Sequence, residues 1–539
     1  MSQRICRLGA AVALTMLALP NVVAAQANGR MTADSLVSVG DVAAQESRHR
    51  VAIQAYERAI ALDSSRRLLL LPRLGRQYLW SDESRQAARL FVEYLGTRPG
   101  SCETKLDLGL ALSWANDLDS ARVTYDEVAA TCLYERGEAR LGAARVLRWG
   151  NHFSDAKKRY RAVMADGTDK DREQAAIGLA YVHLAQAEPR AALRLADSVI
   201  RAGSLDPSAV EARVMAIADL GALGSAVNVV HEERVAGRGS ASMDRLARGY
   251  QDRARPSFSI GARGFRDQDG TTYRAADLGS AAAPLALGTI RMSARAAELR
   301  GDSAVLQSRE AEASIDLRPA AALALLGRAG IRSYDGIDFS PWDGEVDLVW
   351  LPGDHHRVDL AAARLLITDN VAAIQNGLTG TFGSFGLTER LTSQLTTALS
   401  VDATRWSKGN TRVRFRATPR FAFEGVPSVT LEWPTTYQRY SAPFEFRFFS
   451  PREYVETGPA LNVYRRVASV WYLSAYGRAG GLRESGQDWQ ALGIGRASLE
   501  REIRNHWGVR VDAGWSNSNL AGSAGFRRTS LAAGVTIRP

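Results

Sequence analysis

The stretch TRVRFRATPRFAF, residues 411–423, decides the fold class of the second half of this chain. Its apolar residues Val413, Phe415, Phe421 and Phe423 all occupy odd positions, whereas its arginines occupy even positions. Successive side chains of a β-strand point to opposite faces of a sheet. A period of two therefore predicts a strand with one apolar face and one strongly polar face.

The same alternation recurs from about residue 256 to residue 539. It is clearest in VWYLSAYGR (470–478), GVRVDAGW (508–515) and TSLAAGVTIRP (529–539). Turn clusters such as DQDG, YDG, LPGDHH and SKGN separate the segments, as expected between neighbouring strands. We expect about 16 strands, with about 14 as the alternative, because bacterial barrels take an even number.

Two architectures can use strands of this kind. A soluble sandwich would hide the apolar faces in a core, whereas a transmembrane barrel turns them to lipid and keeps the polar faces inside. The polar faces are too rich in arginine, glutamate and aspartate for a dry core, and the sequence holds no long apolar helix. We therefore expect residues 256–539 to form a transmembrane antiparallel β-barrel.

The N-terminal residues 1–27, MSQRICRLGAAVALTMLALPNVVAAQA, have the pattern of a signal peptide. Arg4 and Arg7 precede the apolar run Leu8–Leu19, and small residues follow near Ala25, where cleavage is expected. The apolar run is too short to span a bilayer, which takes about 20 residues. The expected location is therefore the outer membrane, with the segment that precedes the barrel in the periplasm.

Residues 33–245 contain a repeat. In LLLLPRLGRQYLWSDESRQAARLFVEYLGTRPG (68–100), Leu74, Gly75, Tyr78, Ala87, Phe91 and Pro99 follow the order and spacing of a tetratricopeptide repeat. The pattern recurs in small residues at Ala52, Ala87, Ala121, Ala156 and Ala192, in Tyr56, Phe91, Tyr125, Tyr160 and Ala196 four positions later, and in Trp80, Trp114 and Trp149. We expect about six helix pairs stacked into a solenoid that binds partners, then a linker over 246–255.

Two cysteines, Cys102 and Cys132, lie in the repeat segment. In the repeat register Cys102 begins the first helix of a pair and Cys132 ends the second, so the two are expected to lie near each other. An oxidising compartment permits a disulfide between them. Two separate small core residues are the alternative. A zinc site is not expected, because no second cysteine or histidine lies at ligand spacing.

The net charge of +10 comes from arginines that are scattered rather than gathered in runs. Nucleic acid is therefore not an expected partner. We find no phosphate-binding loop, no zinc-protease motif and no nucleophile-elbow motif. Glu310 and Glu312 lie two residues apart on one strand face, which is typical of a barrel lumen rather than of a glycosidase pair. We expect no enzyme activity, cofactor or metal.

The stretch FRFFSPREYVETGPALNVYRR, residues 446–466, adds a motif. Phe444, Phe446 and Phe448 alternate with Glu445 and Arg447, which predicts a further strand that ends at Phe449-Ser450-Pro451. The F-F-S-P-x-x-Y signature and the following Trp471-Tyr472 strand resemble the C-terminal barrel of the BcsC-type outer-membrane subunit of cellulose synthase. Repeats followed by such a barrel are also similar to the export porin for poly-N-acetylglucosamine. Those cellulose subunits have many more repeats than the six expected here.

This resemblance implies export of a polysaccharide across the outer membrane, with the repeats binding the polymer or components of a glycan synthase. The alternative is a repeat scaffold that the barrel merely anchors in lipid. A barrel enzyme that acts on lipid or glycan is a third class, but no nucleophile and base are identified for it. From strand parity, we expect the polymer-contacting lumen residues to be Arg412, Arg414, Arg416, Glu445, Arg447, Tyr472, Tyr476 and Arg478.

Overall fold

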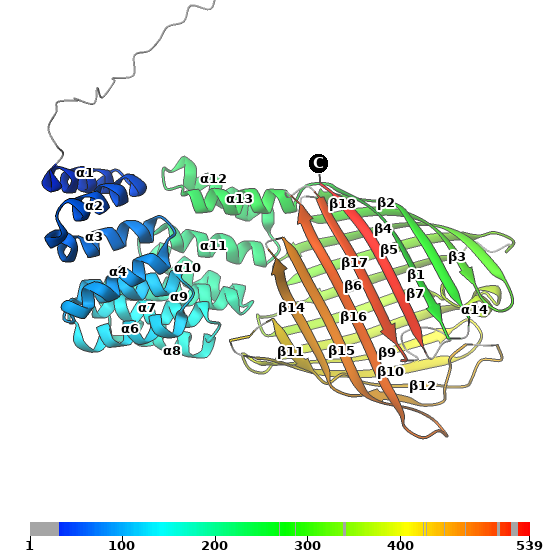
Figure 1. Cartoon of the computed structure of the whole chain (residues 1–539). Helices are drawn as coiled ribbons and strands as arrows, with labels where there is room; N and C mark the ends of the chain where they lie inside the picture. Colours follow the sequence, from blue (N-terminus) through cyan, green and yellow to red (C-terminus); the bar gives the residue numbers. More distant parts are fainter. Residues whose placement is uncertain are drawn as a thin grey trace, which may run out of the picture. The chain divides into compact units, whose positions relative to one another are not determined.

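The computed structural model describes residues 32–538 except 269, 286, 338–340, 424, 427, 447, 469, 504–506 and 519–526. The chain divides into two compact units between Val128 and Ala129. In the described residues, thirteen α-helices precede a single large sheet (Figure 1). The expected signal peptide, residues 1–27, lies outside the described residues.

The helices end only four residues before the first strand. They are α1 (Ala33–Gln45), α2 (His49–Leu62), α3 (Arg67–Trp80), α4 (Ser84–Thr97), α5 (Cys102–Trp114), α6 (Leu118–Thr131), α7 (Arg136–Trp149), α8 (Phe153–Asp166), α9 (Asp169–Ala185), α10 (Pro189–Arg201), α11 (Pro207–Asp219), α12 (Leu223–Val235) and α13 (Ala241–Arg253), with a short 3₁₀ turn at Ser64–Arg66. Among the described helices, none is both long and apolar enough to cross a membrane.

A close contact between a glycine and an aromatic ring recurs where the helices pack. The contacts are Gly40 with Tyr56, Gly75 with Phe91, Gly109 with Tyr125 and Gly178 with Tyr160. A Cβ added at Gly40 or Gly75 would lie 2.5 Å from a ring carbon, closer than van der Waals contact allows. The repeat thus pairs a residue without a side chain with a ring that fills the gap.

The turn inside each helix pair has a residue with positive φ. These residues are Ser47, Asp82, Asn116, Asn151, Ala187 and Gly221, with φ between 53° and 89°. Asn, Asp and Gly tolerate this left-handed conformation best, since their local hydrogen bonding or lack of a Cβ offsets the strain. The recurrence of one strained turn at a period near 35 residues is a second mark of the repeat.

Helix α13 occupies most of the segment that we expected to be a linker. Met243, Ala247 and Tyr250 are buried against α11 and α12, and their spacing of four and three residues is that of one helical face. Because this face packs on the last helix pair, α11 and α12, the chain stays helical to Arg253. Only residues 254–256 separate the helices from the sheet.

Cys102 begins α5, and Cys132 directly follows α6. Both cysteines are in the disulfide-bonded state. A bridge between them stays a prediction: it would close a loop of about 30 residues and stabilise the repeats by roughly 3–4 kcal/mol. Thiol titration of the oxidised, denatured mature protein should find no free thiol, and two free thiols would contradict the bridge.

The sheet contains eighteen strand segments in the described residues. They are β1 (Ser257–Asp267), β2 (Thr272–Leu285), β3 (Gly288–Arg300), β4 (Val305–Ala320), β5 (Leu323–Tyr334), β6 (Trp342–Trp350), β7 (His356–Leu366), β8 (Thr379–Arg390), β9 (Leu395–Trp406), β10 (Thr411–Ala422), β11 (Val429–Glu432), β12 (Thr435–Tyr440), β13 (Tyr454–Thr457), β14 (Ala460–Ala468), β15 (Trp471–Glu484), β16 (Gln490–Ile503), β17 (Trp507–Ser516) and β18 (Arg528–Ile537). A five-residue helix, α14 (Val371–Gln375), lies between β7 and β8.

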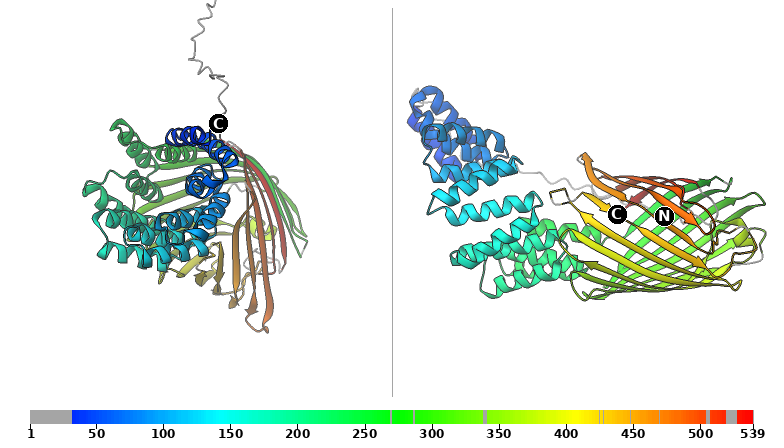
Figure 2. Two further views of the ribbon diagram at one scale, coloured as in Figure 1. Left: turned by 60° about the vertical axis from the view of Figure 1, so that its left-hand side comes forward. Right: turned by 90° about the horizontal axis from the view of Figure 1, so that it is seen from below.

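These segments form a closed antiparallel barrel of 16 strands, which confirms the fold class. Strand β1 pairs with both β2 and β18, so the sheet has no edge. Segments β11 and β12 both pair with β10, and β13 and β14 both pair with β15; each couple is therefore one interrupted strand. The strands run obliquely around the barrel (Figure 2).

The prediction of a strand over 444–448 is wrong. Residues 444–446 and 448 form a loop between β12 and β13, with Glu445 exposed in it, and Arg447 lies outside the described residues. The rings of Phe444, Phe446 and Phe448 pack on one another and on Trp406, with ring centroids 5.2–6.5 Å apart. The alternating phenylalanines belong to a loop. Their rings bury one another instead of facing alternate sides of a sheet.

Candidate functional site

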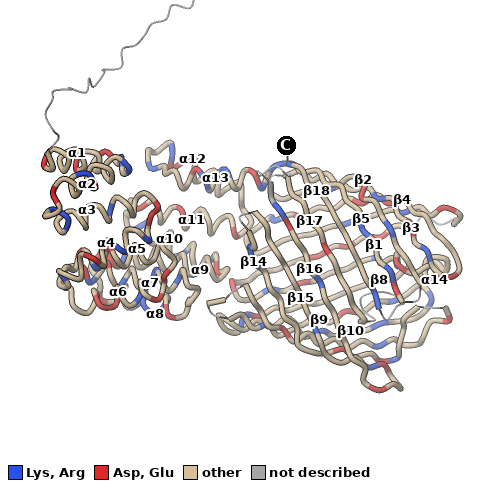
Figure 3. The backbone as a smooth tube through the Cα atoms, viewed as in Figure 1, with Lys and Arg blue, Asp and Glu red and all other residues tan. Residues whose placement is uncertain are grey.

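The two faces of the barrel wall differ in chemistry. Residues opposite one another on neighbouring strands share a face, and Phe385, Val401, Phe415 and Tyr437 form one such row across β8, β9, β10 and β12. This outward face carries large exposed apolar side chains; Phe415 is 51% exposed. The alternate positions carry most of the ion pairs and form the inward face. Charged residues of both signs therefore recur along the strands (Figure 3).

A ladder of ion pairs crosses the inward face of β1–β6. Its nitrogen–oxygen distances are Arg263–Asp277 2.7 Å, Asp277–Arg295 2.7 Å, Arg295–Glu310 3.0 Å, Glu310–Arg332 3.3 Å, Arg332–Asp343 3.0 Å and Asp343–Arg328 2.7 Å. Each carboxylate of the ladder lies between two guanidinium groups. Glu310 is therefore a structural partner of two arginines, which agrees with the lumen interpretation of its sequence pattern.

The three arginines predicted on β10 converge on one carboxylate. Arg412 lies 3.1 Å, Arg414 2.8 Å and Arg416 3.4 Å from a carboxylate oxygen of Asp402 on β9. The Asp402 side chain is fully buried, and the cluster keeps a surplus of two positive charges. We did not single out Asp402 from the sequence, although it alternates with Val401 and Ala403 in the β9 stretch LTTALSVDATRW.

Arg478 forms a second inward cluster where two strands are interrupted. It donates to Glu456 Oε1 at 2.8 Å and to the carbonyl of Pro434 at 2.6 Å. Tyr454 donates its hydroxyl to Glu456 Oε2 at 3.0 Å. Arg478 thus satisfies a carbonyl that lies in the break between β11 and β12, where the regular ladder is lost.

The predicted tyrosines of β15 share the inward face with Arg478. Tyr472 stacks on Tyr464 with centroids 6.1 Å apart, and the Arg466 guanidinium lies 5.9 Å from the Tyr472 ring. Tyr476 lies opposite Arg496, whose guanidinium is 6.0 Å from its ring. Of the eight predicted lumen residues, six share this face on β10 and β15. Glu445 lies in the loop between β12 and β13 and not on this face, and Arg447 lies outside the described residues.

The barrel end opposite the start of β1, here called the distal end, has a folded-in segment, residues 367–378. Val371 and Ile374 of α14 pack on the inward side chains of Leu299, Leu306 and Tyr334. On its other side, Ala373 and Leu378 pack with Trp406 and Tyr440. The segment therefore lies between opposite parts of the wall and narrows the distal mouth. Neither the helix nor its position has a signal in the strand periodicity.

Charged contacts hold this segment in place. Arg528 at the start of β18 donates to Asp369 at 3.0 Å and to both oxygens of Asp267 at 2.7 and 2.8 Å. The Asn370 side chain accepts from the backbone N–H of Ala373 at 2.8 Å and caps α14. These contacts hold residues 369–373 in the position that narrows the distal mouth.

The other end of the barrel, the proximal end, contacts the helices of the second unit. The backbone N–H groups of Arg190 and Ala191 donate to the two oxygens of Asp354 at 3.1 and 2.9 Å. A carboxylate stabilises a helix N-terminus because it satisfies orphan N–H groups and opposes the helix dipole. The Arg190 guanidinium also donates to the carbonyls of Gly353, Ala321 and Leu351 in proximal turns. The N-terminus of α10 thus contacts two proximal turns of the barrel, the one between β4 and β5 and the one between β6 and β7.

Glu188 lies beside this joint and is 4% exposed. It accepts from Lys157 at 2.9 Å and from His183, while His355 in a proximal turn and Arg390 at the proximal end of β8 lie at 3.4 and 3.6 Å. Burial alone would raise the pKa of Glu188, but the hydrogen bonds from His183 and Lys157 outweigh burial and lower it to about 2. The buried carboxylate therefore stays charged at neutral pH.

We expect Glu188→Gln to change the acid stability of the helices. A carboxyl whose pKa falls on folding stabilises the fold above its unfolded pKa, and this contribution is lost between about pH 4.5 and pH 2. Its size is about 3 kcal/mol. Unfolding free energies at pH 7 and pH 2.5 should therefore differ less in Glu188→Gln than in the wild type. Equal pH dependence in both proteins would contradict this role, and the exposed Glu127→Gln is the control.

Comparisons with known proteins find no matching family model and no matching curated protein. Among solved structures, a bacterial polysaccharide outer membrane secretin aligns at 12% identity and TM-score 0.43 over 53% of this chain and 99% of its own. A tetratricopeptide repeat protein from Parabacteroides merdae aligns at 12% identity and TM-score 0.34 over 41% and 86%. OccK7 from Pseudomonas aeruginosa aligns at 8% identity and TM-score 0.32 over 52% and 98%.

Proposed function

We propose that this chain is an outer-membrane conduit for a secreted polysaccharide. The observation that carries the proposal is the inward face of the barrel, where arginines, carboxylates and tyrosines lie opposite an apolar outward face. Apolar outward strands suit lipid. Guanidinium groups donate several hydrogen bonds to oxygen atoms, and aromatic rings stack on the faces of sugars. Such a lining suits a hydrated, polar chain.

In this proposal residues 1–27 are removed during export, and the helical repeats lie in the periplasm before the barrel. The repeats bind the polymer or components of an inner-membrane glycan synthase, as repeat arrays commonly bind partners along an extended surface. Cellulose and poly-N-acetylglucosamine are the candidate polymers from the resemblance stated above. The surplus positive charge around Asp402 also suits a polymer with anionic groups, which neither cellulose nor poly-N-acetylglucosamine carries.

The narrowed distal mouth supports a second candidate function. Because α14 lies between opposite parts of the wall and narrows the distal mouth, export through this mouth in our proposal requires residues 367–378 to move. If they never move, the barrel is an anchor and the repeats act as a scaffold for periplasmic proteins. The two candidates therefore differ in whether the distal mouth opens.

The test is conductance of the purified mature chain in a planar bilayer. Replacement of residues 368–377 by a short Gly-Ser linker removes the apolar contacts of α14, so conductance should rise several-fold over the wild type. Soluble candidate polymers added on one side should block the enlarged current. If the variant conducts no better than the wild type, the conduit is contradicted and the scaffold is favoured.

The location is checked in the same preparation. The wild type and the linker variant should both fractionate with the outer membrane and migrate differently on a gel before and after heating, as folded barrels do. Recovery of the wild type as a soluble periplasmic protein would contradict both candidate functions.

A further inference from the structure

The outward face is unequally charged at its two ends. Eight arginines occupy outward positions near the distal ends of their strands: Arg266, Arg274, Arg300, Arg309, Arg364, Arg405, Arg439 and Arg483. Their registers place them in the apolar rows; Arg439, for example, lies opposite Val413. Near the proximal end, the described strands carry outward arginines at Arg465 and Arg501.

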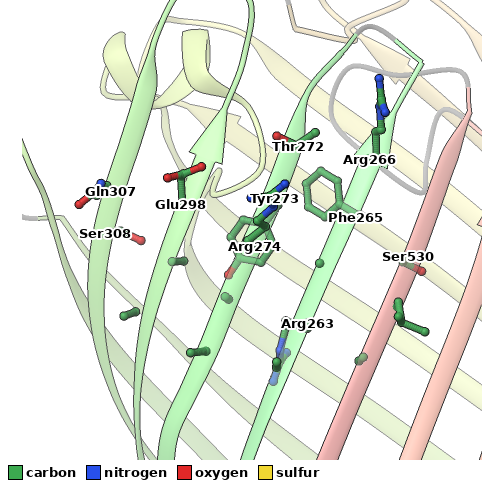
Figure 4. Close-up of a pocket in the computed structure, with 18 of the residues that line it drawn as sticks. Arg263, Phe265, Arg266, Thr272, Tyr273, Arg274, Glu298, Gln307, Ser308 and Ser530 are labelled. Atoms are coloured by element: carbon green, nitrogen blue, oxygen red, sulfur yellow. The ribbon is translucent and has the colours of Figure 1, made fainter.

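The distal arginines are densest around a hollow of about 980 Å³ on the outer surface of β18 and β1–β4. Its floor is formed by small outward residues, among them Ala262, Gly264 and Ala276. Arg266 and Arg274 lie on neighbouring strands at its rim (Figure 4). Small side chains leave room for a ligand between the guanidinium groups.

Three arginines of this hollow, Arg266, Arg274 and Arg309, have no ion-pair partner among the described residues, and all three are exposed. Two carboxylates, Glu298 and Asp335, also line the hollow, and Glu298 lies 3.6 Å from Arg300. The three arginines outnumber these carboxylates, so the hollow presents an excess of positive charge above an apolar floor. A ligand that carries anionic groups on a hydrocarbon part would match both the arginines and the apolar floor.

We propose that the hollow, here called the distal arginine patch, binds the phosphate groups of a glycolipid in the leaflet at the distal end. The proposal rests on the membrane location proposed above. Guanidinium groups form bidentate hydrogen bonds with phosphate. An arginine on the outward face costs about 2–4 kcal/mol at the bilayer midplane but only about 0–1 kcal/mol near the interface, so the distal positions are those that lipid headgroups reach.

The apolar surface next to the patch favours a lipid over free phosphate. Ile260 and Met292 are 47% and 60% exposed on the same face, farther toward the proximal end. Acyl chains of a bound glycolipid would lie along these side chains while its phosphates meet the arginines. Free phosphate would gain only the arginine contacts.

The test uses the full mature chain in detergent, with heat-modifiable migration as the measure of a folded barrel. Native mass spectrometry would compare bis-phosphorylated lipid A with the same lipid after chemical dephosphorylation. We expect the wild type to bind the phosphorylated lipid at least about tenfold more tightly, which is about 1.4 kcal/mol. Inorganic phosphate at about ten times the lipid concentration should displace little of it, because it lacks the hydrocarbon.

Two matched variants separate the patch from general positive charge. Arg266→Gln, Arg274→Gln and Arg309→Gln together should abolish the preference for the phosphorylated lipid. Arg465→Gln with Arg501→Gln, on the same face near the proximal end, should keep it. Equal binding of both lipids by the wild type, equal loss in both variants, or full displacement by phosphate would each overturn the patch. A folded, conducting barrel without lipid preference would overturn only the patch, whereas an unfolded or soluble chain contradicts the membrane location itself.

Discussion

Phe415→Arg should destabilise the membrane-inserted barrel by about 2–4 kcal/mol, because Phe415 lies nearer the bilayer midplane. Val413→Arg should cost less, about 0–1 kcal/mol, because Val413 lies directly opposite the outward Arg439 at the distal end. Both side chains lie in the outward rows of β10, and Phe415 is half exposed there. A guanidinium at Phe415 would have to leave water for hydrocarbon without a carboxylate partner. Urea unfolding of the variants in lipid vesicles, followed by gel migration before and after heating, measures the loss. The double variant should fail to assemble.

Ser474→Arg is the matched control, because Ser474 lies on the inward face of β15 and is exposed there. It introduces the same charge on a face that already carries Tyr472 and Arg466. We expect it to assemble with nearly wild-type stability. Normal assembly of Phe415→Arg together with failure of Ser474→Arg would reverse the assignment of the two faces.

Asp402→Asn should be the most damaging single substitution on the inward face. It removes the carboxylate that Arg412, Arg414 and Arg416 share. Breaking a buried ion pair from one side typically costs about 3–5 kcal/mol, because the remaining charge stays buried without a partner. The lower end applies here, because Arg416 is 43% exposed to solvent. Ion currents of the surviving barrels should shift toward anions.

The shared carboxylate also determines how the arginines must be tested. Replacing all three by glutamine leaves Asp402 buried and unpaired, so that variant should be unstable as well. Adding Asp402→Asn to the three glutamines removes every charge of the cluster and should restore folding while abolishing the anion preference. A stable Asp402→Asn protein with unchanged selectivity would contradict the role of this cluster.

Much of the fold followed from periodicity. A period near 35 residues in Ala87, Phe91 and their equivalents predicted the helix pairs, since each pair packs against the next in the same way. A period of two in TRVRFRATPRFAF separated Arg414 from Phe415, and that parity holds in the register of β9 and β10. The 16 strands agree with the number expected.

The run around Phe446 shows where periodicity misleads. Alternating phenylalanines satisfy the pattern of a strand, yet Pro443, Ser450 and Pro451 bound a segment whose rings find Trp406 and Tyr440 instead. Mutual burial of the aromatic rings outweighed strand pairing, because the prolines lack the backbone N–H groups that hydrogen bonds between strands need. Local alternation cannot tell these outcomes apart without knowledge of the neighbouring loops.

The sequence by itself determined the periods, and with them the helix pairs, most of the strands and the two faces of strands such as β10, because these depend on near neighbours along the chain. Only the tertiary structure decided which strands meet when the barrel closes. That closure places Asp402 beside three arginines, Arg528 beside Asp369, and α14 between two walls that are far apart in sequence. Long-range pairing of this kind depends on the register of the whole barrel, which no single segment encodes.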